Sequence, residues 1–324
     1  MSIKIAVWSL TTVLLTTAPL AHAQQQKIYR IGVVYPGGPL RETIDGLRAG
    51  LKDLGLAEGK QFTLAIEDTK GDTKTAEAAA KNFEREKVDL IFAIAGSVIA
   101  SAKQATTSVP IVFCTGSDPV AAKLVDDFAR PGGRLTGVHY LARDLTAKRL
   151  EILKEILPKL SRVVTFYNPA TRVAVEAAAM AREEAKRLGV KLLERHVKSN
   201  DELRKGLQAL KVGEADALIY IPDATVISHA QLIIDTAKAK KLPTMFQDES
   251  LVAQGGLASY GQNFQEIGRL AAKYIQKVLS GTSPKDLRIE TVDNADLTIN
   301  LKTAKELGVT VPPQVLARAK RVIK

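Results

Sequence analysis

The sequence holds one cysteine and four histidines in 324 residues. Cys114 alone cannot form a disulfide within the chain, and its place at the end of a β-branched run favours a small buried side chain over a reactive thiol. His139, His196 and His229 lack the H-x-x-x-H spacing or cysteine neighbours of zinc ligands. We therefore expect no metal site.

Motifs for nucleotide binding or covalent catalysis are also missing. No G-x-G-x-x-G, P-loop or G-x-S-x-G spacing occurs, and the glycine pairs that begin at 37, 132 and 255 are more typical of turns. A nucleophilic Ser97 would need a histidine beside it, and the sequence indicates none. We expect neither an enzyme nor a bound cofactor.

Long apolar runs are absent except at the N-terminus. There a lysine, an apolar stretch and Ala21-His22-Ala23 form the three parts of a secretory signal, so we expect residues 1–23 to be a signal peptide and the mature chain to begin at Gln24. A membrane anchor is the alternative, but several hydroxyl side chains and Pro19 make the stretch too polar for a good span. The expected location is the periplasm.

The composition is 46% hydrophobic and 25% charged, typical of a soluble globular protein, with a net charge of +11. This excess of positive charge raises the possibility of a nucleic-acid partner. The basic residues, however, alternate with acidic ones along helical stretches such as 182–187, and solvated helix faces explain that pattern better. We expect no nucleic-acid partner.

The length is sufficient for two domains, and strands alternate with amphipathic helices along the whole chain. In the first half we expect strands at 28–34, 62–66, 89–95, 111–114 and 135–138, with helices at 40–54, 73–86, 96–106 and between Pro119 and Arg130. In the second half we expect strands at 162–167, 190–195, 217–221, 243–246, 257–260 and 287–291, and helices at 145–157, 172–188, 227–239, 264–279 and 303–307, one after the capping box of Ser199 and Glu202, and a last one after Pro313.

The two halves resemble each other. Residues 88–97 match 215–224, and residues 109–113 match 242–246. Alternation of strands and helices produces a parallel sheet with helices on both faces. The repeat therefore predicts an α/β protein with two similarly wound sheets.

Ligands of open parallel sheets bind beyond the carboxyl ends of the strands. If the two lobes face each other, six loops line one cleft, and the free backbone N–H groups of helices beginning near Ser97 and Asp118 can hold an anionic group. Asp118 and Asp223 have an alternative role as helix caps. The candidate ligand-binding residues are Tyr35, Gly37, Gly96, Ser97, Thr115, Ser117, Asp118, Tyr167, Asn168, Pro222, Asp223 and Asp248.

Several motifs in order resemble the ABC-transporter substrate-binding proteins of the tryptophan/tyrosine-binding type. The resemblance covers nearly the whole mature chain and rests on the segments 109–113, 117–120, 129–133, 136–138, 148–158, 167–169, 256–261 and 299–304. It implies a type I periplasmic binding fold, with two Rossmann-like lobes, a multi-strand hinge and a ligand in the cleft. It also implies that Ser97, Ser117, Asp118, Asn168 and Asp223 contact the ligand.

On this basis we expect one lobe from residues 24–139 with about 261–282, and a second from 140–260 with about 283–324. Relatives of this type bind amino acids, aromatic ones among them. They often carry a His-Pro pair in the first loop and a Gly-Thr-Pro-Ala type run in the third, where this chain has Tyr35-Pro36-Gly37-Gly38 and Ala95-Gly96-Ser97-Val98. The ligand therefore does not transfer with the fold.

Our leading hypothesis is capture of a small molecule, an amino acid or related apolar or aromatic zwitterion, for an ABC importer. The expected partners are the ligand and the permease and ATPase subunits, with only peripheral contact to the membrane, and we expect a monomer. The alternative is a periplasmic sensor, or a sugar- or nucleoside-binding protein, of the same fold. A repressor of this fold needs an N-terminal helix-turn-helix where a signal peptide stands, and a secreted enzyme has no motif in its favour.

Overall fold

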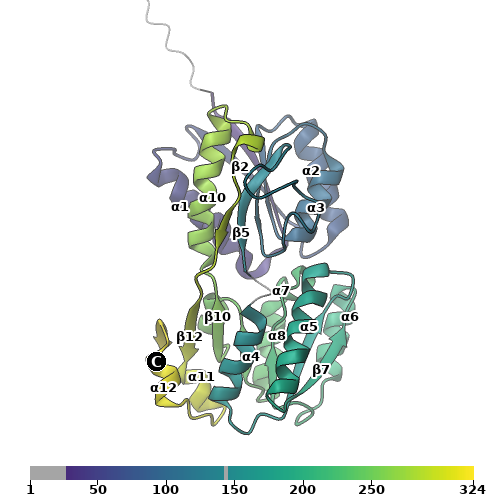
Figure 1. Cartoon of the computed structure of the whole chain (residues 1–324), viewed down its shortest axis with the longest axis vertical. Coiled ribbons are helices and arrows are strands. Elements are labelled where there is room, and N and C mark those ends of the chain that lie inside the picture. The colour runs from purple at the N-terminus through teal and green to yellow at the C-terminus, as the bar shows by residue number, and fades with distance from the viewer. Residues whose placement is uncertain (1–26, 142–144) are drawn as a thin grey trace, which may run out of the picture.

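The protein folds as two α/β lobes placed end to end, seen one above the other in Figure 1. The computed structural model describes residues 27–141 and 145–324. The expected signal peptide and its cleavage site lie outside these residues. Among the described helices, none combines the length and the apolar character needed to cross a membrane.

The first lobe is built on a parallel sheet of order β11-β5-β4-β3-β1-β2. Its central strands β3 and β4 are short apolar runs that are buried at every position, as expected for a sheet covered on both faces. Cys114 on β4 is fully buried, which raises the pKa of its thiol and matches the expected structural role. The strands are β1 (Tyr29–Tyr35), β2 (Phe62–Asp68), β3 (Leu90–Ile94), β4 (Ile111–Thr115), β5 (Leu135–Tyr140) and β11 (Glu290–Val292).

Two pairs of helices sandwich this sheet. Apolar side chains of α1 and α10 pack on one face, and alanines and Phe83 of α2 pack with α3 on the other. The helices of the first lobe are η1 (Gly38–Leu40), α1 (Arg41–Asp53), α2 (Thr73–Arg85), α3 (Gly96–Ala105), α10 (Phe264–Leu279) and η2 (Pro284–Asp286).

The second lobe has a sheet of order β13-β12-β10-β9-β8-β6-β7, in which only β10 and β12 pair antiparallel. Its strands are β6 (Arg162–Tyr167), β7 (Lys191–His196), β8 (Ala217–Ile219), β9 (Thr244–Phe246), β10 (Ala258–Gly261), β12 (Asp296–Asn300) and β13 (Arg321–Ile323). Its helices are α4 (Leu145–Ile156), α5 (Arg172–Arg187), α6 (Asn200–Ala209), α7 (Ala224–Ile227), α8 (Ala230–Ala239), α9 (Glu249–Ala253), α11 (Leu301–Glu306) and α12 (Pro313–Ala317).

The expected α/β architecture is confirmed, because the strand order β2-β1-β3-β4-β5 in the first sheet is repeated as β7-β6-β8-β9-β10 in the second. The chain passes between the lobes after β5, after β10 and between β11 and β12. One detail of the expected division differs. Residues 283–292 were assigned to the second lobe, but β11 pairs with Val138–Tyr140 of β5, so the crossing lies after Val292.

The helix expected after Pro119 does not form, and residues 119–129 are turns and bends instead. Asp118 still accepts hydrogen bonds from the N–H groups of Val120 and Ala121, as a helix cap would. Lys123, however, has a φ of +56°, which no helix tolerates. A capping side chain stabilises turns as well as helices, so the motif alone did not distinguish them.

The C-terminal part also differs from the expectation. The helix expected over 227–239 begins only at Ala230, as α8, and Ile227 is instead the last residue of α7. Between the two helices the hydroxyl of Ser228 donates to the carbonyl of Thr225 at 2.8 Å. Strands β12 and β13 were not predicted, and the last helix ends at Ala317. β13 has three residues at the edge of the sheet, and so short a strand has no visible alternation in the sequence.

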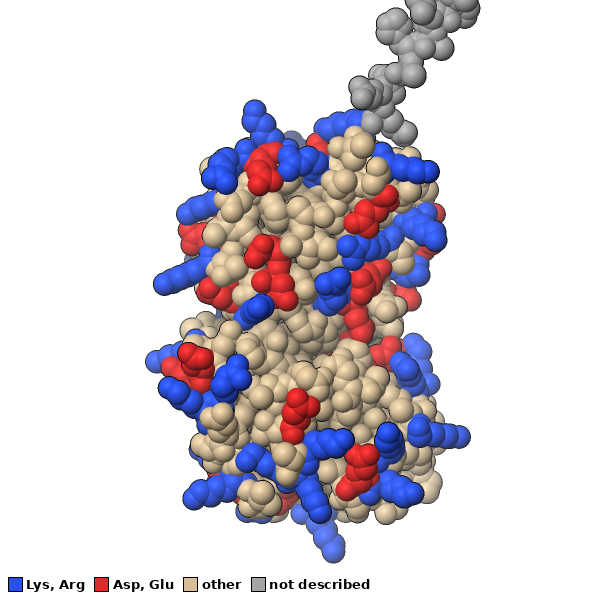
Figure 2. Space-filling model, turned by 180° about the vertical axis from the view of Figure 1, so that it is seen from behind, with Lys and Arg blue, Asp and Glu red and all other residues tan. Residues whose placement is uncertain are grey.

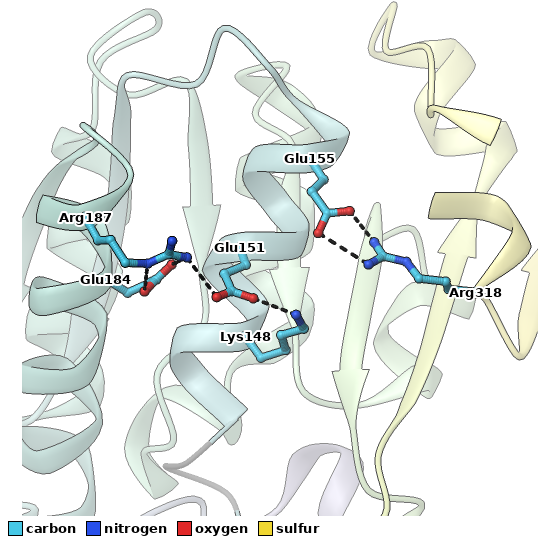
Figure 3. A network of polar contacts seen from close by, with 6 residues as sticks. All are labelled: Lys148, Glu151, Glu155, Glu184, Arg187 and Arg318. Atoms are coloured by element: carbon cyan, nitrogen blue, oxygen red, sulfur yellow. Dashed lines mark hydrogen bonds and ion pairs between the residues drawn. The ribbon is translucent and has the colours of Figure 1, made fainter. Parts of the chain in front are cut away.

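Charged side chains of both signs cover the surface. Figure 2 shows Lys and Arg interspersed with Asp and Glu over the face seen from behind, without one continuous basic patch. In the second lobe, Glu151 on α4 accepts from Lys148 and from Arg187 of α5, and Glu155 pairs with Arg318 (Figure 3). The pairs with Arg187 and Arg318 join α4 to α5 and to the end of α12.

Candidate functional site

A cavity of about 560 Å³ lies between the two lobes. Its walls come from the loops at the carboxyl ends of β3, β4, β6, β8 and β9, which is where open parallel sheets bind ligands. A cavity of this volume is large enough for a small organic molecule. The polar and charged residues of the wall are Thr73, Ser97, Ser117, Asp118, Lys123, Asn168, Thr171, Arg172, Glu176, Asp223 and Gln247.

The N-terminus of α3 opens into the cavity. Ala95, Gly96 and Ser97 all line it, and no side chain caps this helix. Ala95 has a φ of +78°, a conformation that costs a residue with a side chain roughly 1–3 kcal/mol and that collects at functional sites. The strained residue is the N-cap of α3, and the uncapped N–H groups of a helix N-terminus favour a negatively charged group.

Asp118 lies in the same wall on the loop after β4. Its Oδ1 atom accepts from the N–H groups of Val120 at 2.9 Å and Ala121 at 3.0 Å. The side chain is only partly buried, and Oδ2 makes no hydrogen bond within the described residues. One carboxylate oxygen thus shapes the loop while the other is available to a cationic group of a ligand.

Asp223 in the opposite wall has a different environment. It is 4% exposed, and its two oxygens accept from the N–H groups of Asn168 and Val226, each at 3.0 Å. Burial raises its pKa, and the hydrogen bonds from Asn168 and Val226 oppose that shift. Asp223 therefore joins the β6 and β8 loops and caps α7.

Two tyrosines lie against the cavity from the two lobes. Tyr140, at the end of β5, packs edge-on against Phe264 with ring centroids 5.7 Å apart. The hydroxyl of Tyr220 accepts from the N–H of Asp223 at 2.9 Å. Burial raises the pKa of both phenols, so both are neutral at physiological pH.

Seven of the twelve candidate residues line the cavity together: Gly96, Ser97, Ser117, Asp118, Asn168, Pro222 and Asp223. The cavity is also lined by residues that were not among the candidates, namely Leu40, Tyr140, Arg172 and Glu176. Tyr140 was missed because β5 extends two residues beyond the expected strand. Arg172 and Glu176 are one helical turn apart on α5, directly after the Asn168 loop, so helical spacing could have indicated them.

The other five candidates lie outside the lining. The hydroxyl of Tyr35 donates to Asp68 at 3.3 Å, and Gly37 precedes η1 beside the same carboxylate. The hydroxyl of Thr115 accepts from the N–H of Ser117 at 3.0 Å and so shapes the Asp118 loop. Tyr167 donates at 2.7 Å to Glu194 of the neighbouring edge strand β7.

Asp248, the fifth, caps α9 by accepting from the N–H and the hydroxyl of Ser250. It is 1% exposed, and its Oδ2 atom is buried without a hydrogen-bond partner among the described residues. Burial, and then the negative charge of Glu42, raises its pKa to about 7. Its neighbour Gln247 reaches the cavity in its place.

No cluster of three or more His, Cys, Asp or Glu side chains suited to a metal ion occurs within residues 27–141 and 145–324. The wall instead offers hydroxyls, amides and carboxylates together with a helix N-terminus. Such groups suit a polar organic ligand that carries charges of both signs.

Comparison with known proteins agrees with this geometry. A tyrosine-binding protein of Clostridioides difficile is 28% identical over 288 residues, which cover 89% of this chain and 82% of that protein. The structure of an ABC domain in complex with L-Trp from Streptococcus pneumoniae has a TM-score of 0.82 at 25% identity, covering 92% of this chain and 100% of that one. The ligand-free, open structure of a substrate binding protein with adhesive properties from Clostridium difficile has a TM-score of 0.61 at 28% identity, with the same coverage.

The family model described as ABC transporter substrate binding protein matches residues 31–323, which is nearly all of the described chain. Proteins of this family bind small molecules and do not transform them, in agreement with the absence of a catalytic motif. They work outside the cytoplasm with a permease and an ATPase. The chain belongs to the ABC transporter substrate-binding protein family.

Proposed function

We propose that the protein captures an α-amino acid in the interlobe cavity and delivers it to an ABC importer. The observation that carries this proposal is the pairing of two opposite charge preferences in one wall. The uncapped N-terminus of α3 favours the carboxylate of a zwitterion, and Asp118 favours its ammonium group. A sugar needs neither.

The remaining lining accounts for the side chain of the ligand. Leu40, Val173 and Ile227 are apolar, and Tyr140 and Tyr220 add aromatic surface. Burial of an apolar side group against these residues contributes roughly 25 cal/mol per Å² of area removed from water. The relatives whose names mention tyrosine and L-Trp support an aromatic amino acid as the first ligand to test.

The arrangement of the lobes corresponds to the ligand-holding state. The TM-score is higher with the L-Trp complex than with the open, ligand-free structure, although the sequence identity is slightly lower. Direct hydrogen bonds also join the lobes. For example, the side chain of Asn200 in the second lobe donates to the carbonyl of Lys70 in the first at 3.1 Å. In this proposal the protein is exported by a signal peptide cleaved after Ala23, closes around its ligand as a monomer in the periplasm, and docks on the permease.

Scanning calorimetry of the protein with each of the twenty amino acids, and with sugars and nucleosides, tests the proposal. At a hundredfold excess over Kd, a ligand that binds only the folded state stabilises it by about 2.7 kcal/mol. Each kcal/mol raises the Tm of a domain of this size by roughly 2–4 °C, so the true ligand shifts it by several degrees. A response to a sugar or nucleoside, with every amino acid silent, would replace the amino-acid hypothesis by the alternative.

Variants of the two wall aspartates test the site itself. A charged hydrogen bond contributes about 1.5–3 kcal/mol, so we expect Asp118→Asn to weaken amino-acid binding tenfold or more without loss of stability. Asp223→Asn keeps an N-capping side chain but loses its charge, and we expect it to lower stability more than affinity. Equal affinity of Asp118→Asn and the unaltered protein would remove Asp118 from the site.

A further inference from the structure

One arginine reaches across the mouth of the cavity from the second lobe to the first. Arg172 is the first residue of α5, and its Nη1 atom donates to the carbonyl oxygen of Ala121 on the loop after β4. Both residues line the cavity. The hydrogen bond therefore closes the wall at the point where the two lobes meet.

The acceptor is held in place by the first lobe. Within the loop, Ala122 donates to the carbonyl of Asp118 and Lys123 to that of Val120, which leaves the carbonyl of Ala121 for another donor. Lys103 of α3 donates to the carbonyls of Lys123 and Leu124 at 2.8 and 3.1 Å. The loop is thus tied to α3 and presents one carbonyl oxygen toward the second lobe.

The donor is oriented by the second lobe. The Nε atom of Arg172 donates to Oε1 of Glu176, four residues later on α5, at 2.8 Å. The planar guanidinium can make this bond and still direct Nη1 outward. Glu176 therefore holds the side chain in the geometry that reaches Ala121.

We propose that Arg172 is a positioning residue that latches the lobes closed and thereby sets how long the ligand stays bound. On another part of the interface, Ser228 and Asn200 donate to the carbonyl of Lys70 at 3.3 and 3.1 Å. The two sets of bonds and the hinge hold the lobes around the cavity.

The latch shares its loop with Asp118, whose Oδ1 atom accepts from the N–H of Ala121 itself. A ligand bound to Asp118 stiffens this loop and strengthens the latch, and the latch in turn retains the ligand. This step rests on the proposed function, whereas the effect of the latch on the lobes does not.

The closed population can be measured without a ligand. Cys114 is fully buried and is therefore not accessible to a spin label. Labels attached to Lys81→Cys and Lys205→Cys, both at exposed positions, then report the distance between α2 and α6. These helices lie on one side of the molecule and the β11–β12 crossing on the other, so opening separates them (Figure 1). We expect Arg172→Ala to reduce the ratio of closed to open molecules about tenfold, the effect of one charged hydrogen bond.

Glu176→Gln should shift the ratio in the same direction by less, and Lys186→Ala, an exposed cation at the other end of α5, should leave it unchanged. An unaltered ratio in Arg172→Ala, or no closed population in the unaltered protein, would overturn the latch. Neither result depends on which ligand the cavity holds, so the proposed function is tested separately.

A second experiment uses L-tryptophan as the probe. The sequence has one tryptophan, Trp8 in the expected signal peptide, so the fluorescence of the mature protein does not mask that of the ligand. In stopped-flow fluorescence we expect Arg172→Ala to raise the dissociation rate about tenfold and to change the association rate less than threefold. A loss of affinity with unaltered lobe distances would make Arg172 a ligand contact instead and overturn its role as a latch. If neither L-tryptophan nor any other amino acid binds, but Arg172→Ala still shifts the spin-label distance, the ligand class is refuted and the latch is retained.

Discussion

The hydroxyl of Tyr220 makes two hydrogen bonds to the main chain of Asp223. It accepts from the N–H at 2.9 Å and donates to the carbonyl at 3.2 Å. Both residues line the cavity and both are nearly buried. The side chain of Tyr220, which directly follows β8, therefore sets the path of the loop that carries Asp223. The Oδ2 atom of Asp223 in turn accepts a hydrogen bond from the N–H of Asn168, which directly follows β6.

We expect Tyr220→Phe to lower the free energy of unfolding by about 1–3 kcal/mol, because the buried N–H of Asp223 loses its acceptor while the ring remains. Urea unfolding measures this change. Tyr29→Phe, at a partly exposed position of β1, is the control and should stay within about 0.5 kcal/mol. Equal stability of the two variants would show that the loop does not depend on the hydroxyl.

A second prediction concerns pH and Asp248, whose pKa of about 7 in the folded protein lies above the value of about 3.9 in an unfolded chain. Between these values the folded state binds more protons than the unfolded state, so its stability falls as pH rises. The slope is at most about 1.4 kcal/mol per pH unit. Glu84, whose pKa is held at about 2 chiefly by the N–H of Ser108, makes stability rise with pH up to its unfolded value of about 4.3 and has no effect above about pH 5.

We expect Asp248→Asn to reduce the fall in the free energy of unfolding between pH 5 and 8. Since asparagine also caps α9, the variant should be more stable than the unaltered protein at pH 8. Urea unfolding at each pH measures the slopes. Asp235→Asn, at an exposed position of α8, should keep the original slope. Parallel curves for Asp248→Asn and the unaltered protein would contradict the raised pKa.

Gly71 allows the lobes to approach each other. A Cβ atom there would lie 2.8 Å from Cα of Thr225 in the opposite lobe. We expect Gly71→Ala to hinder closure and weaken ligand binding tenfold or more. Gly213 has the same φ of +77° with open space around it, so Gly213→Ala reproduces the backbone strain of about 1 kcal/mol without the contact. Equal affinity of the two variants would show that closure tolerates the added methyl group.

The ion pairs of Figure 3 should differ in their effect on stability. The side chains of Arg318 and Glu155 are 46% and 36% exposed, and we expect Arg318→Ala to change the free energy of unfolding by less than about 1 kcal/mol. Glu184 is 10% exposed, so Arg187→Ala leaves a mostly buried carboxylate without its cation and should cost more. Urea unfolding in low and high salt measures both changes, and the reverse order would refute the argument from burial.

Local patterns in the sequence predicted most of the elements. The strand predicted over 162–167 has the same first and last residues as β6. Ser199 caps α6, as predicted, by accepting from the N–H of Glu202. The matching segments 88–97 and 215–224 are β3 with the start of α3 and β8 with the start of α7. Such predictions succeed because side-chain periodicity, capping and strand propensity act over a few residues.

The site was predictable in part for the same reason. The rule that ligands bind beyond the carboxyl ends of strands selected Ser97, Asp118, Asn168 and Asp223, which do line one cavity. It also selected Tyr167 and Asp248, whose backbones lie at strand ends but whose side chains turn to Glu194 and Ser250. The end of a strand specifies where the main chain lies, and not which neighbour its side chain meets.

The sequence by itself determined that this is an α/β protein of two similar halves, with polar loops after its strands, because those features follow from the order of residues along the chain. Only the tertiary structure decided that Arg172 meets Ala121, that β11 belongs to the first sheet, and that the segment after Asp118 forms turns. Each of these depends on partners at least 20 residues away, such as Lys103 for Lys123 and Val138 for Glu290. Contacts over such separations form only when distant parts of the chain fold against one another, so no local pattern encodes them.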